Sequence, residues 1–223
     1  MKDANAEETH WERAAKTKMG KYLTKTEADF ISERIDLGRM KLVMDVGAEA
    51  GRFSVFAAEK NVAVIGIDLD SYGLKRLRLK NRPVTLIQAD ARYIPLKGDL
   101  LDAVFMIQVI DYIPELEIAL AECQRTMKNG GSLILSFGND SSLKSKMRKL
   151  HGKSYLHSYQ EIVQVFKNVN LRITKKVGYN WLPFGRTSEN LLIPSLAKIE
   201  KLLGLRRLAR YSPWVIIHAV KSG

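Results

Sequence analysis

The sequence predicts a doubly wound α/β fold with a mainly parallel sheet. Short, β-branched apolar runs recur along the chain, and most of the segments between them have the length of a helix. Strands that alternate with helices form βαβ units, which place helices on both faces of a parallel sheet. With 223 residues, of which 46% are hydrophobic, the chain suits one such domain with a sizeable core.

Seven strands are expected, five of them before residue 140. Their predicted ranges are residues 41–46, 62–67, 84–87, 103–108, 132–137, 171–177 and 214–220. Gly130 and Gly131 predict the turn before the fifth strand. Helices are predicted at residues 9–18, 25–37 and near 158–167, with Thr24 or Thr26 as the N-cap of the second.

Composition excludes several classes of protein. The single cysteine, Cys123, excludes an intramolecular disulfide framework and a multi-cysteine zinc site, and no metal site is predicted. The first 16 residues are charged and have no apolar core, so no signal peptide is predicted. The longest apolar runs, such as residues 103–110, are far shorter than the roughly 20 residues that span a bilayer. These observations predict a soluble, cytoplasmic protein.

The net charge of +12 is concentrated in the last third of the chain. Residues 141–223 contain 16 Lys and Arg but only 3 Asp and Glu, whereas residues 1–140 contain 20 and 21. This distribution indicates a neutral platform that holds one ligand and a basic segment that faces something anionic. Solvated surface lysines and arginines are the alternative.

The stretch VMDVGAEAGRFS, residues 43–54, is a buried-strand pattern that breaks at a glycine and enters a helix. A dinucleotide fingerprint requires glycines at i, i+2 and i+5, but from Gly47 these positions hold Gly47, Glu49 and Arg52. The Gly-Lys-Ser/Thr end of a P-loop is absent as well. Because Glu49 would repel a phosphate, this residue and Asp45 favour a cationic ligand. S-adenosylmethionine carries both a sulfonium and an ammonium.

Two further acids end predicted strands. Asp68 follows Asp45 by 23 residues and is placed to accept hydrogen bonds from both ribose hydroxyls. Asp90 ends the third strand, where it is placed to accept a bond from an adenine amino group, and Ala91 is small enough to let the ring lie flat. Each acid alone is typical of a helix N-cap or a turn. Together, at the carboxyl ends of three successive strands, they predict one nucleoside site.

These stretches together resemble the class I S-adenosylmethionine-dependent methyltransferases, in the broad group that acts on small molecules and lipids. The resemblance covers about residues 42–137 and rests on VMDVGAEAGRFS, VIGIDLD, QADARYIPLKGDLLDAVFMIQVIDYIP and MKNGGSLILSF. It implies a seven-stranded Rossmann-like sheet with an N-terminal helical lid (1–40), an S-adenosylmethionine-binding core (41–140) and a basic C-terminal part (141–223). This last part carries a helical insertion on the acceptor side and closes the sheet.

One residue departs from the family pattern. Glu49 stands where the family's middle glycine usually lies. Its side chain either contacts the methionine ammonium or turns outward, and outward exposure is favoured.

The resemblance also implies which residues bind the cofactor. They are Tyr22, Asp45, Gly47, Ala48, Gly51, Asp68, Leu69, Asp90, Ala91 and Gln108. Gly47 and Ala48 would pass under the methionine part, and Leu69 would cover the adenine. Gln108 would end the fourth strand beside the reacting methyl group. Tyr22 either closes over the cofactor as a lid or packs within its helical segment.

The implied reaction is methyl transfer from the sulfonium to a nucleophile. It depends on in-line alignment and exclusion of water, and it needs a base only if the acceptor must lose a proton. No catalytic residue is assigned; the candidates for a base are Asp111, His151, His157 and Tyr159. The sequence IQVIDYIP lacks the Asn-Pro-Pro-Tyr motif that resembles enzymes acting on amino groups of bases. Cys123 lies in a predicted helix, which disfavours a catalytic cysteine.

The basic third is expected to contain an amphipathic helix. Its apolar and basic positions are Leu196, Ile199, Leu202, Leu203 and Leu208, and Lys198, Lys201, Arg206, Arg207 and Arg210. Such a helix caps the sheet, contacts an anionic membrane surface or attracts an acidic acceptor. RNA is a weaker option, because no RNA-binding module is present. Trp181, Phe184 and Trp214 are expected to line an acceptor pocket.

The predicted function is therefore methyl transfer to a small-molecule or lipid-like acceptor. If the basic third attracts the acceptor, the acceptor carries acidic groups. The alternative is a non-catalytic protein of methyltransferase fold that binds RNA or an anionic membrane surface through its basic third. The sequence assigns no oligomeric state.

Overall fold

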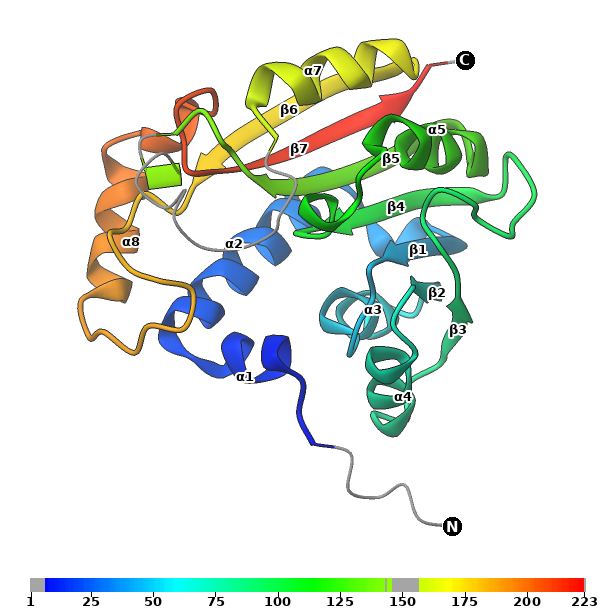
Figure 1. Ribbon diagram of the computed structural model, residues 1–223, viewed down its shortest axis with the longest axis horizontal. Coiled ribbons are helices and arrows are strands. Elements are labelled where there is room, and N and C mark those ends of the chain that lie inside the picture. Colours follow the sequence, from blue (N-terminus) through cyan, green and yellow to red (C-terminus); the bar gives the residue numbers. More distant parts are fainter. Residues whose placement is uncertain (1–6, 143, 146–156, 223) are drawn as a thin grey trace.

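A computed structural model describes residues 7–142, 144, 145 and 157–222, which contribute seven strands to one sheet (Figure 1). The strand order is β3-β2-β1-β4-β5-β7-β6. The strands are β1 (Leu42–Val46), β2 (Ala63–Asp68), β3 (Val84–Gln88), β4 (Leu101–Ile107), β5 (Met127–Gly138), β6 (Leu171–Tyr179) and β7 (Trp214–Lys221). Neighbours among β1 to β5 pair in parallel, whereas β7 is antiparallel to both β5 and β6. The predicted doubly wound, mainly parallel sheet is confirmed.

Helices cover both faces of this sheet. Those in the described residues are α1 (His10–Lys16), α2 (Lys18–Arg34), α3 (Arg52–Ala58), α4 (Ser71–Leu79), α5 (Leu116–Thr126), α7 (Tyr159–Asn168) and α8 (Ile193–Leu202). Three short 3₁₀ turns are η1 (Leu37–Arg39), η2 (Ile110–Tyr112) and η3 (Leu205–Arg207). Apolar residues of α2 and α3 pack on one face, and those of α5 and α7 pack on the other (Figure 1).

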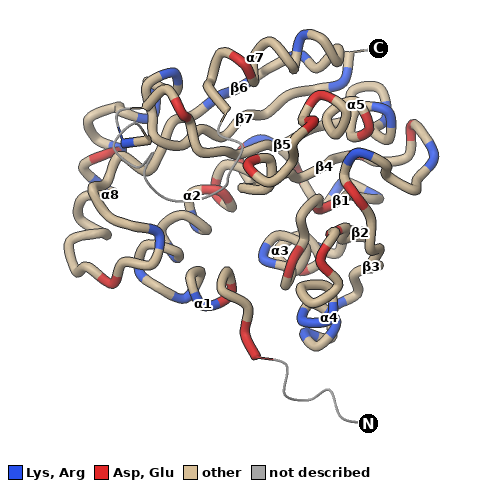
Figure 2. The backbone as a smooth tube through the Cα atoms, in the orientation of Figure 1, with Lys and Arg blue, Asp and Glu red and all other residues tan. Residues whose placement is uncertain are grey.

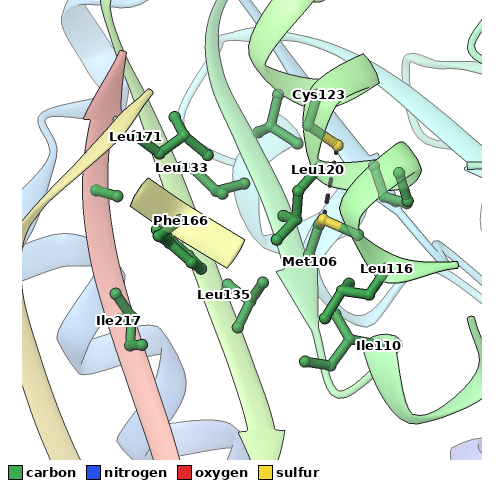
Figure 3. Packing of buried hydrophobic residues seen from close by; sticks show 14 of the residues in the cluster. Met106, Ile110, Leu116, Leu120, Cys123, Leu133, Leu135, Phe166, Leu171 and Ile217 are labelled. Atoms are coloured by element: carbon green, nitrogen blue, oxygen red, sulfur yellow. Dashed lines mark hydrogen bonds between the residues drawn. The ribbon is translucent and has the colours of Figure 1, made fainter. Parts of the chain in front are cut away.

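The core beneath α5 and α7 consists of interlocking aliphatic and aromatic side chains (Figure 3). Phe166 of α7 lies against Leu133 and Leu135 of β5, all fully buried. Cys123 of α5 meets Met106 of β4 with 3.6 Å between the two sulfur atoms. Burial raises the pKa of the Cys123 thiol to about 12, so the thiolate that a nucleophile requires does not form at neutral pH.

The N-terminal helices begin at other residues than predicted. The chain turns at Thr17, whose hydroxyl accepts a hydrogen bond from the Gly20 N–H at 3.0 Å and caps α2. Thr24 and Thr26, the expected caps, lie inside that helix. Gly20 explains the tight corner, since a Cβ there would lie 1.9 Å from the carbonyl oxygen of Ala14 in α1.

The predicted basic helix is not continuous. It is divided into α8 and η3, because Gly204 adopts a left-handed conformation with φ of +66°. Ile193 and Leu196 of α8 pack on the core, whereas Leu202 is 86% exposed and Leu203 is 66% exposed, so only the first part of the helix has the packing of a cap.

Candidate functional site

A cavity of about 1050 Å³ opens at the carboxyl ends of β1, β2 and β4. The strand order reverses between β1 and β4, which is where open α/β sheets bind ligands. The cavity is lined by the loops after these strands, by parts of α3 and α4, by the segment from Glu7 to Leu23, and by Arg186 from the loop before α8. The site is therefore built on the sheet and covered by segments distant in sequence.

The loop after β1 lies close over the end of the sheet. The N–H groups of Gly47 and Ala48 donate to the carbonyl oxygen of Ile67 in β2, at 2.9 and 3.0 Å. Gly47 has φ of +72°, and a Cβ there would lie 2.4 Å from a methyl carbon of Val109. A glycine is therefore required where the loop passes the end of β4.

Glu49 does not turn outward as expected. It lines the cavity in a left-handed conformation with φ of +46°, and its N–H donates to the Asp68 carboxylate at 2.8 Å. One oxygen of its own carboxylate accepts from the Ala50 N–H at 2.7 Å, while Oε1 is buried and has no hydrogen-bond partner among the described residues. A buried carboxylate oxygen without a donor is costly, so this atom indicates a ligand that donates to it.

Asp45 and Asp68 complete an acidic wall with Glu49. Asp45 is buried and accepts a 2.6 Å hydrogen bond from the Ser54 hydroxyl, and burial raises its pKa to about 6. Burial also raises the pKa of Asp68. In the described part of the chain, no Lys or Arg forms an ion pair with these three carboxylates. Figure 2 shows acidic residues around the loops beside α3 and β2.

Gln108 follows β4 and takes part in a buried polar network. It is left-handed (φ of +59°), and its side-chain amide donates to Glu27 Oε1. The hydroxyls of Ser136 and Tyr179 donate to the same oxygen at 3.2 and 2.6 Å. Arg52 Nη1 lies 3.5 Å from the other oxygen of this fully buried carboxylate. The network fixes Gln108 between the sheet and α2.

The sequence analysis missed Glu27. The sequence indicates its burial through its spacing: Glu27 lies four residues after Leu23 and three before Phe30, on the otherwise apolar face of α2. A charge at such a position is buried only when partners satisfy it.

Half of the ten cofactor-binding residues implied by the resemblance meet at the cavity. Asp45, Gly47, Ala48, Asp68 and Gln108 all line it. Gly51 lies behind them, where a Cβ would be 2.1 Å from a methyl carbon of Leu77 in α4, so its role is to let α4 approach.

Besides Gly51, four of the implied residues lie outside the cavity lining. The Tyr22 hydroxyl is bonded to both carboxylate oxygens of Glu200 at 2.8 Å, so helix packing describes its position and a lid contact does not. The Asp90 carboxylate is held by Arg92, with Nη2 and Oδ2 2.6 Å apart, and this pairing lowers its pKa. Leu69 is 68% exposed, and Ala91 is also absent from the lining. A cofactor contact for them stays a prediction.

The candidate bases lie elsewhere too. Asp111, His157 and Tyr159 are not among the cavity-lining residues, and His151 lies outside the described residues. The Tyr159 hydroxyl accepts from Lys176 at 2.6 Å. Of the aromatic residues expected to line an acceptor pocket, none contacts the cavity directly, but Trp214 supports the cavity-lining Arg186 from behind.

The segment before α2 closes the cavity from the outside. Glu12 of α1 pairs with Arg76 at 3.0 Å and with Lys80 at 3.3 Å, both of α4 or its C-cap. The Tyr72 hydroxyl donates to the Glu7 carbonyl oxygen at 2.6 Å. Because α1 continues directly into α2, these contacts connect α2 to α4 across the opening (Figure 1).

Neither a metal centre nor a membrane-spanning helix is present in the part of the chain that the structure describes. No cluster of three or more His, Cys, Asp or Glu side chains there has the arrangement of a metal site. No helix there combines the length and the apolar character that crossing a membrane requires.

Comparison with known proteins agrees with this architecture. Residues 44–135 match the family described as a methyltransferase domain. The chain is 27% identical over 129 residues to a malonyl-[acyl-carrier protein] O-methyltransferase of Hamiltonella defensa, covering 55% of this chain and 50% of that protein. It is 31% identical over 121 residues to a ubiquinone biosynthesis O-methyltransferase of Xanthomonas oryzae pv. oryzae, covering 51% and 49%. The chain thus spans about half the length of these curated relatives.

A solved structure shares the fold over nearly the whole chain. It is a S-adenosylmethionine-dependent methyltransferase of Thermotoga maritima, which superimposes with a TM-score of 0.68 at 17% identity and covers 95% of this chain and 94% of its own. The sheet order, the glycine loop, the acid at the end of β2 and these matches lead to one conclusion. By its match over residues 44–135 and by its fold, the chain is similar to the class I S-adenosylmethionine-dependent methyltransferases.

Proposed function

We propose that this protein transfers a methyl group from S-adenosylmethionine to a small-molecule or lipid-like acceptor. The observation that carries the proposal is the wall of Asp45, Glu49 and Asp68, three carboxylates without an ion-pair partner in the described residues of the chain. The cofactor carries an ammonium, a sulfonium and two ribose hydroxyls, which match such a wall in charge and in hydrogen-bonding character. A nucleotide phosphate does not match it.

The residues present fit the parts of this cofactor. Asp68 is the acceptor for the ribose hydroxyls, and the buried Oε1 of Glu49 is the acceptor for the ammonium. The Gly47–Ala48 backbone passes beneath the methionine part. The absence of a Cβ at Gly47 lets this loop lie close to Val109. When bound, S-adenosylmethionine supplies a methyl group on a positively charged sulfur that is open to nucleophilic attack.

The remaining residues would position the acceptor and exclude water. Gln108 is fixed by Glu27 at the end of β4, while Val109 and Tyr112 present apolar surface beside it. The α1 segment covers the opening. Proximity and dehydration are the main contributions available to such a site, and they suit a transfer that needs no covalent enzyme intermediate. The cavity volume of about 1050 Å³ lies at the upper end of ordinary ligand pockets, roughly 300–1,000 Å³, which favours two ligands side by side.

The relatives support the acceptor class. Their names include an O-methyltransferase of malonyl-[acyl-carrier protein] and one of ubiquinone biosynthesis, which favour an acyl or lipid-like acceptor. The test has two steps: calorimetric titration with S-adenosylmethionine, then transfer of a radiolabelled methyl group to small molecules and lipids of a cell extract. Absence of cofactor binding up to about 1 mM, the top of the usual KM range, contradicts the proposal. Binding without any labelled product favours the non-catalytic alternative.

A second candidate activity is contact with an anionic membrane surface. The exposed leucines Leu191, Leu202 and Leu203 lie in the same segment as the exposed basic residues Lys198, Lys201 and Arg207. The one acid of this segment, Glu200, is buried against Tyr22. Exposed apolar residues between cations are typical of helices that lie on anionic lipid surfaces.

Charge reversal tests this contact. Changing Lys198, Lys201 and Arg207 to Glu is expected to abolish sedimentation with phosphatidylserine-containing vesicles and to leave S-adenosylmethionine affinity unchanged. Arg206 is left intact because it lies 3.3 Å from buried Glu200. A parent protein that ignores these vesicles at low salt excludes the contact, and one that binds RNA instead supports the RNA alternative.

A further inference from the structure

Arg186 is a cation on the cavity wall that has no ion-pair partner among the described residues. It lies in the loop between β6 and α8 and lines the cavity that also contains Asp68 and Gln108. Within residues 7–142, 144, 145 and 157–222, its guanidinium forms no ion pair and no side-chain hydrogen bond. An arginine carries five N–H donors in a planar fork, and here the protein leaves them for a ligand or water.

Two tryptophans hold the guanidinium in place. Its central carbon lies 4.2 Å from the ring centre of Trp11 in α1 and 4.5 Å from that of Trp214 in β7. Such cation–π contacts bind the faces of a guanidinium and leave its N–H edges open. Trp11 also meets Tyr112 edge-on, at 6.5 Å between ring centres, so this part of the cavity is walled by aromatic rings.

The backbone around Arg186 is fixed as well. The Met19 N–H donates to the Ser188 carbonyl oxygen at 3.0 Å, and the Thr17 hydroxyl lies 3.4 Å from the carbonyl oxygen of Arg186 itself. The start of α2 thus holds the loop. Because the side chain and the backbone are both restrained, little conformational entropy remains to be lost when a ligand binds.

The charge balance at this end of the cavity is positive. The guanidinium of Arg52 pairs with the buried Glu27, and no carboxylate of the described residues forms an ion pair with Arg186. Burial lowers the pKa of Arg186, and the charge of Arg52 acts in the same direction. A cation placed in a partly buried site at this cost is usually retained for an anion. The cavity therefore has an acidic wall, formed by Asp45, Glu49 and Asp68, and a separate positive charge at Arg186.

We propose that Arg186 binds a carboxylate of the methyl acceptor and so selects acceptors that carry one. The inference rests on the proposed function and deepens it. A carboxylate is planar and accepts two parallel N–H bonds from an arginine edge, and its single charge equals the one uncompensated charge of Arg186. A phosphate monoester carries about −1.5 to −2 at neutral pH, which would leave excess negative charge in a cavity that already holds an acidic wall.

The cofactor's own carboxylate is the other anion that this cavity would receive. The acceptor is favoured because Arg186 and one of its two supporting rings, Trp214, belong to the C-terminal part, and the other, Trp11, belongs to α1, whereas the cofactor residues come from the loops after β1 and β2. Binding of a cofactor fragment distinguishes a carboxylate of the acceptor from the carboxylate of the cofactor. Methylthioadenosine lacks the amino-acid part of S-adenosylhomocysteine and therefore its carboxylate.

The experiment measures binding and does not depend on turnover. Protein saturated with S-adenosylhomocysteine is titrated calorimetrically with two matched pairs, 4-hydroxybenzoate with 4-hydroxybenzamide and octanoate with octanamide. The parent protein is expected to bind at least one carboxylate about tenfold more tightly than its amide, as charge-assisted bidentate bonds are stronger than neutral ones. In Arg186→Gln the preference is lost. Arg186→Lys, which keeps the charge without the fork, is expected to retain part of it.

Controls separate this site from general charge and from folding. Arg210→Gln removes an exposed arginine that lies 5.9 Å from the ring of Tyr211, outside the cavity, and is expected to keep the full preference. Unchanged S-adenosylhomocysteine affinity in Arg186→Gln shows that the variant is folded and that the cofactor carboxylate lies elsewhere.

Three outcomes overturn the proposal: no preference for either carboxylate in the parent, a preference that survives in Arg186→Gln, or a loss of S-adenosylhomocysteine affinity without a loss of methylthioadenosine affinity. The last would assign Arg186 to the cofactor. Failure of the proposed function has a different signature, because a protein that binds no S-adenosylhomocysteine fails before any carboxylate is added.

Discussion

The carboxylate of Glu27 accepts a hydrogen bond from the side-chain amide of Gln108, and this bond joins α2 to the end of β4 across 81 positions of sequence. The same carboxylate oxygen serves Ser136 and Tyr179. The position of Gln108 at the cavity is therefore set by a residue of α2, a helix whose apolar residues pack on the sheet. The residue that fixes the site is one that touches no expected ligand.

Removing this carboxylate should destabilise the fold. In Glu27→Ala the buried groups of Gln108, Tyr179 and Arg52 lose their common partner, and we expect the free energy of unfolding to fall by about 3–5 kcal/mol. Urea unfolding measures it. Glu27→Gln keeps an acceptor and should lose less, while Glu33→Ala, an exposed change on the same helix, should have an effect within about 0.5 kcal/mol. Equal losses in all three variants would exclude the network as the cause.

Asp68 is expected to dominate cofactor affinity. Its carboxylate holds the N–H groups of Glu49 and Asp70 at 2.8 and 2.9 Å, so Asp68→Ala disrupts the loop and removes the acceptor for the ribose. We expect S-adenosylmethionine affinity to fall by about 2–3 kcal/mol, since bonds to charged groups contribute roughly 1.5–3 kcal/mol each. Calorimetry of the parent, Asp68→Ala and the exposed control Asp29→Ala measures this. Unchanged affinity in Asp68→Ala would show that the ribose lies elsewhere.

Cofactor binding should depend on pH through Asp45. Its pKa, raised to about 6 by burial, means that the carboxylate takes up a proton below that pH and no longer attracts a cation. Affinity for S-adenosylmethionine is therefore expected to be constant above pH 6 and to fall by up to about tenfold per unit below it. The dependence should be much weaker in Asp45→Asn. A parallel decline in both proteins would assign the titration to another group, such as Asp68.

The same group should affect stability in the opposite direction. Because the folded-state pKa of Asp45 lies above the unfolded value of 3.8, the folded protein binds more protons between about pH 4 and 6. This contribution to stability falls as pH rises through that window, by up to about 1.4 kcal/mol per unit. Carboxylates with lowered pKa values, such as Glu12 and Asp90, make the folded protein more stable as pH rises. The contribution of Asp45 is therefore measured as the difference in the free energy of unfolding in urea between the parent and Asp45→Asn across this pH window.

The closure by α1 should control how long the cofactor stays. Glu12→Gln weakens the contacts to Arg76 and Lys80, which are more buried than ordinary surface pairs. We expect the dissociation rate of S-adenosylmethionine to rise several-fold in stopped-flow displacement, because the segment opens more often. Glu59→Gln breaks an exposed pair with Arg82 outside the cavity and should leave the rate unchanged. A rate that is the same in all three proteins would mean that α1 does not limit release.

The sequence predicted the parts of the site that are local. Asp45 and Asp68 each end a β-branched run, and the parallel register of β1 and β2 brings them to one edge, as expected. Local patterns were also misleading where tertiary contacts decided the outcome. Thr24 and Thr26 are good N-cap residues, yet α2 begins at the corner that Gly20 allows.

The parts that were not predictable depend on long-range contacts. Glu27 receives hydrogen bonds from residues 81 to 152 positions away, and no local pattern encodes such partners. Arg186 is placed by rings from α1 and β7, which become neighbours only in the folded chain. The sequence favoured an outward orientation of Glu49, but its side chain lines the cavity, and the loop packs against Gly73, where a Cβ would lie 2.9 Å from the Glu49 backbone.

The strand order has a consequence for how the chain is made. β7 lies between β5 and β6, although it follows both in sequence. During synthesis on a ribosome, β6 leaves the exit tunnel before the strand that will cover its hydrogen-bonding edge has been translated. The strands β1 to β5 are then able to pair with one another. The backbone N–H and C=O groups of β6 stay unpaired until β7 has been made, and they are exposed to pairing with other chains. Trp214, the first residue of β7, is also one support of Arg186, so the part of the cavity around Arg186 forms last.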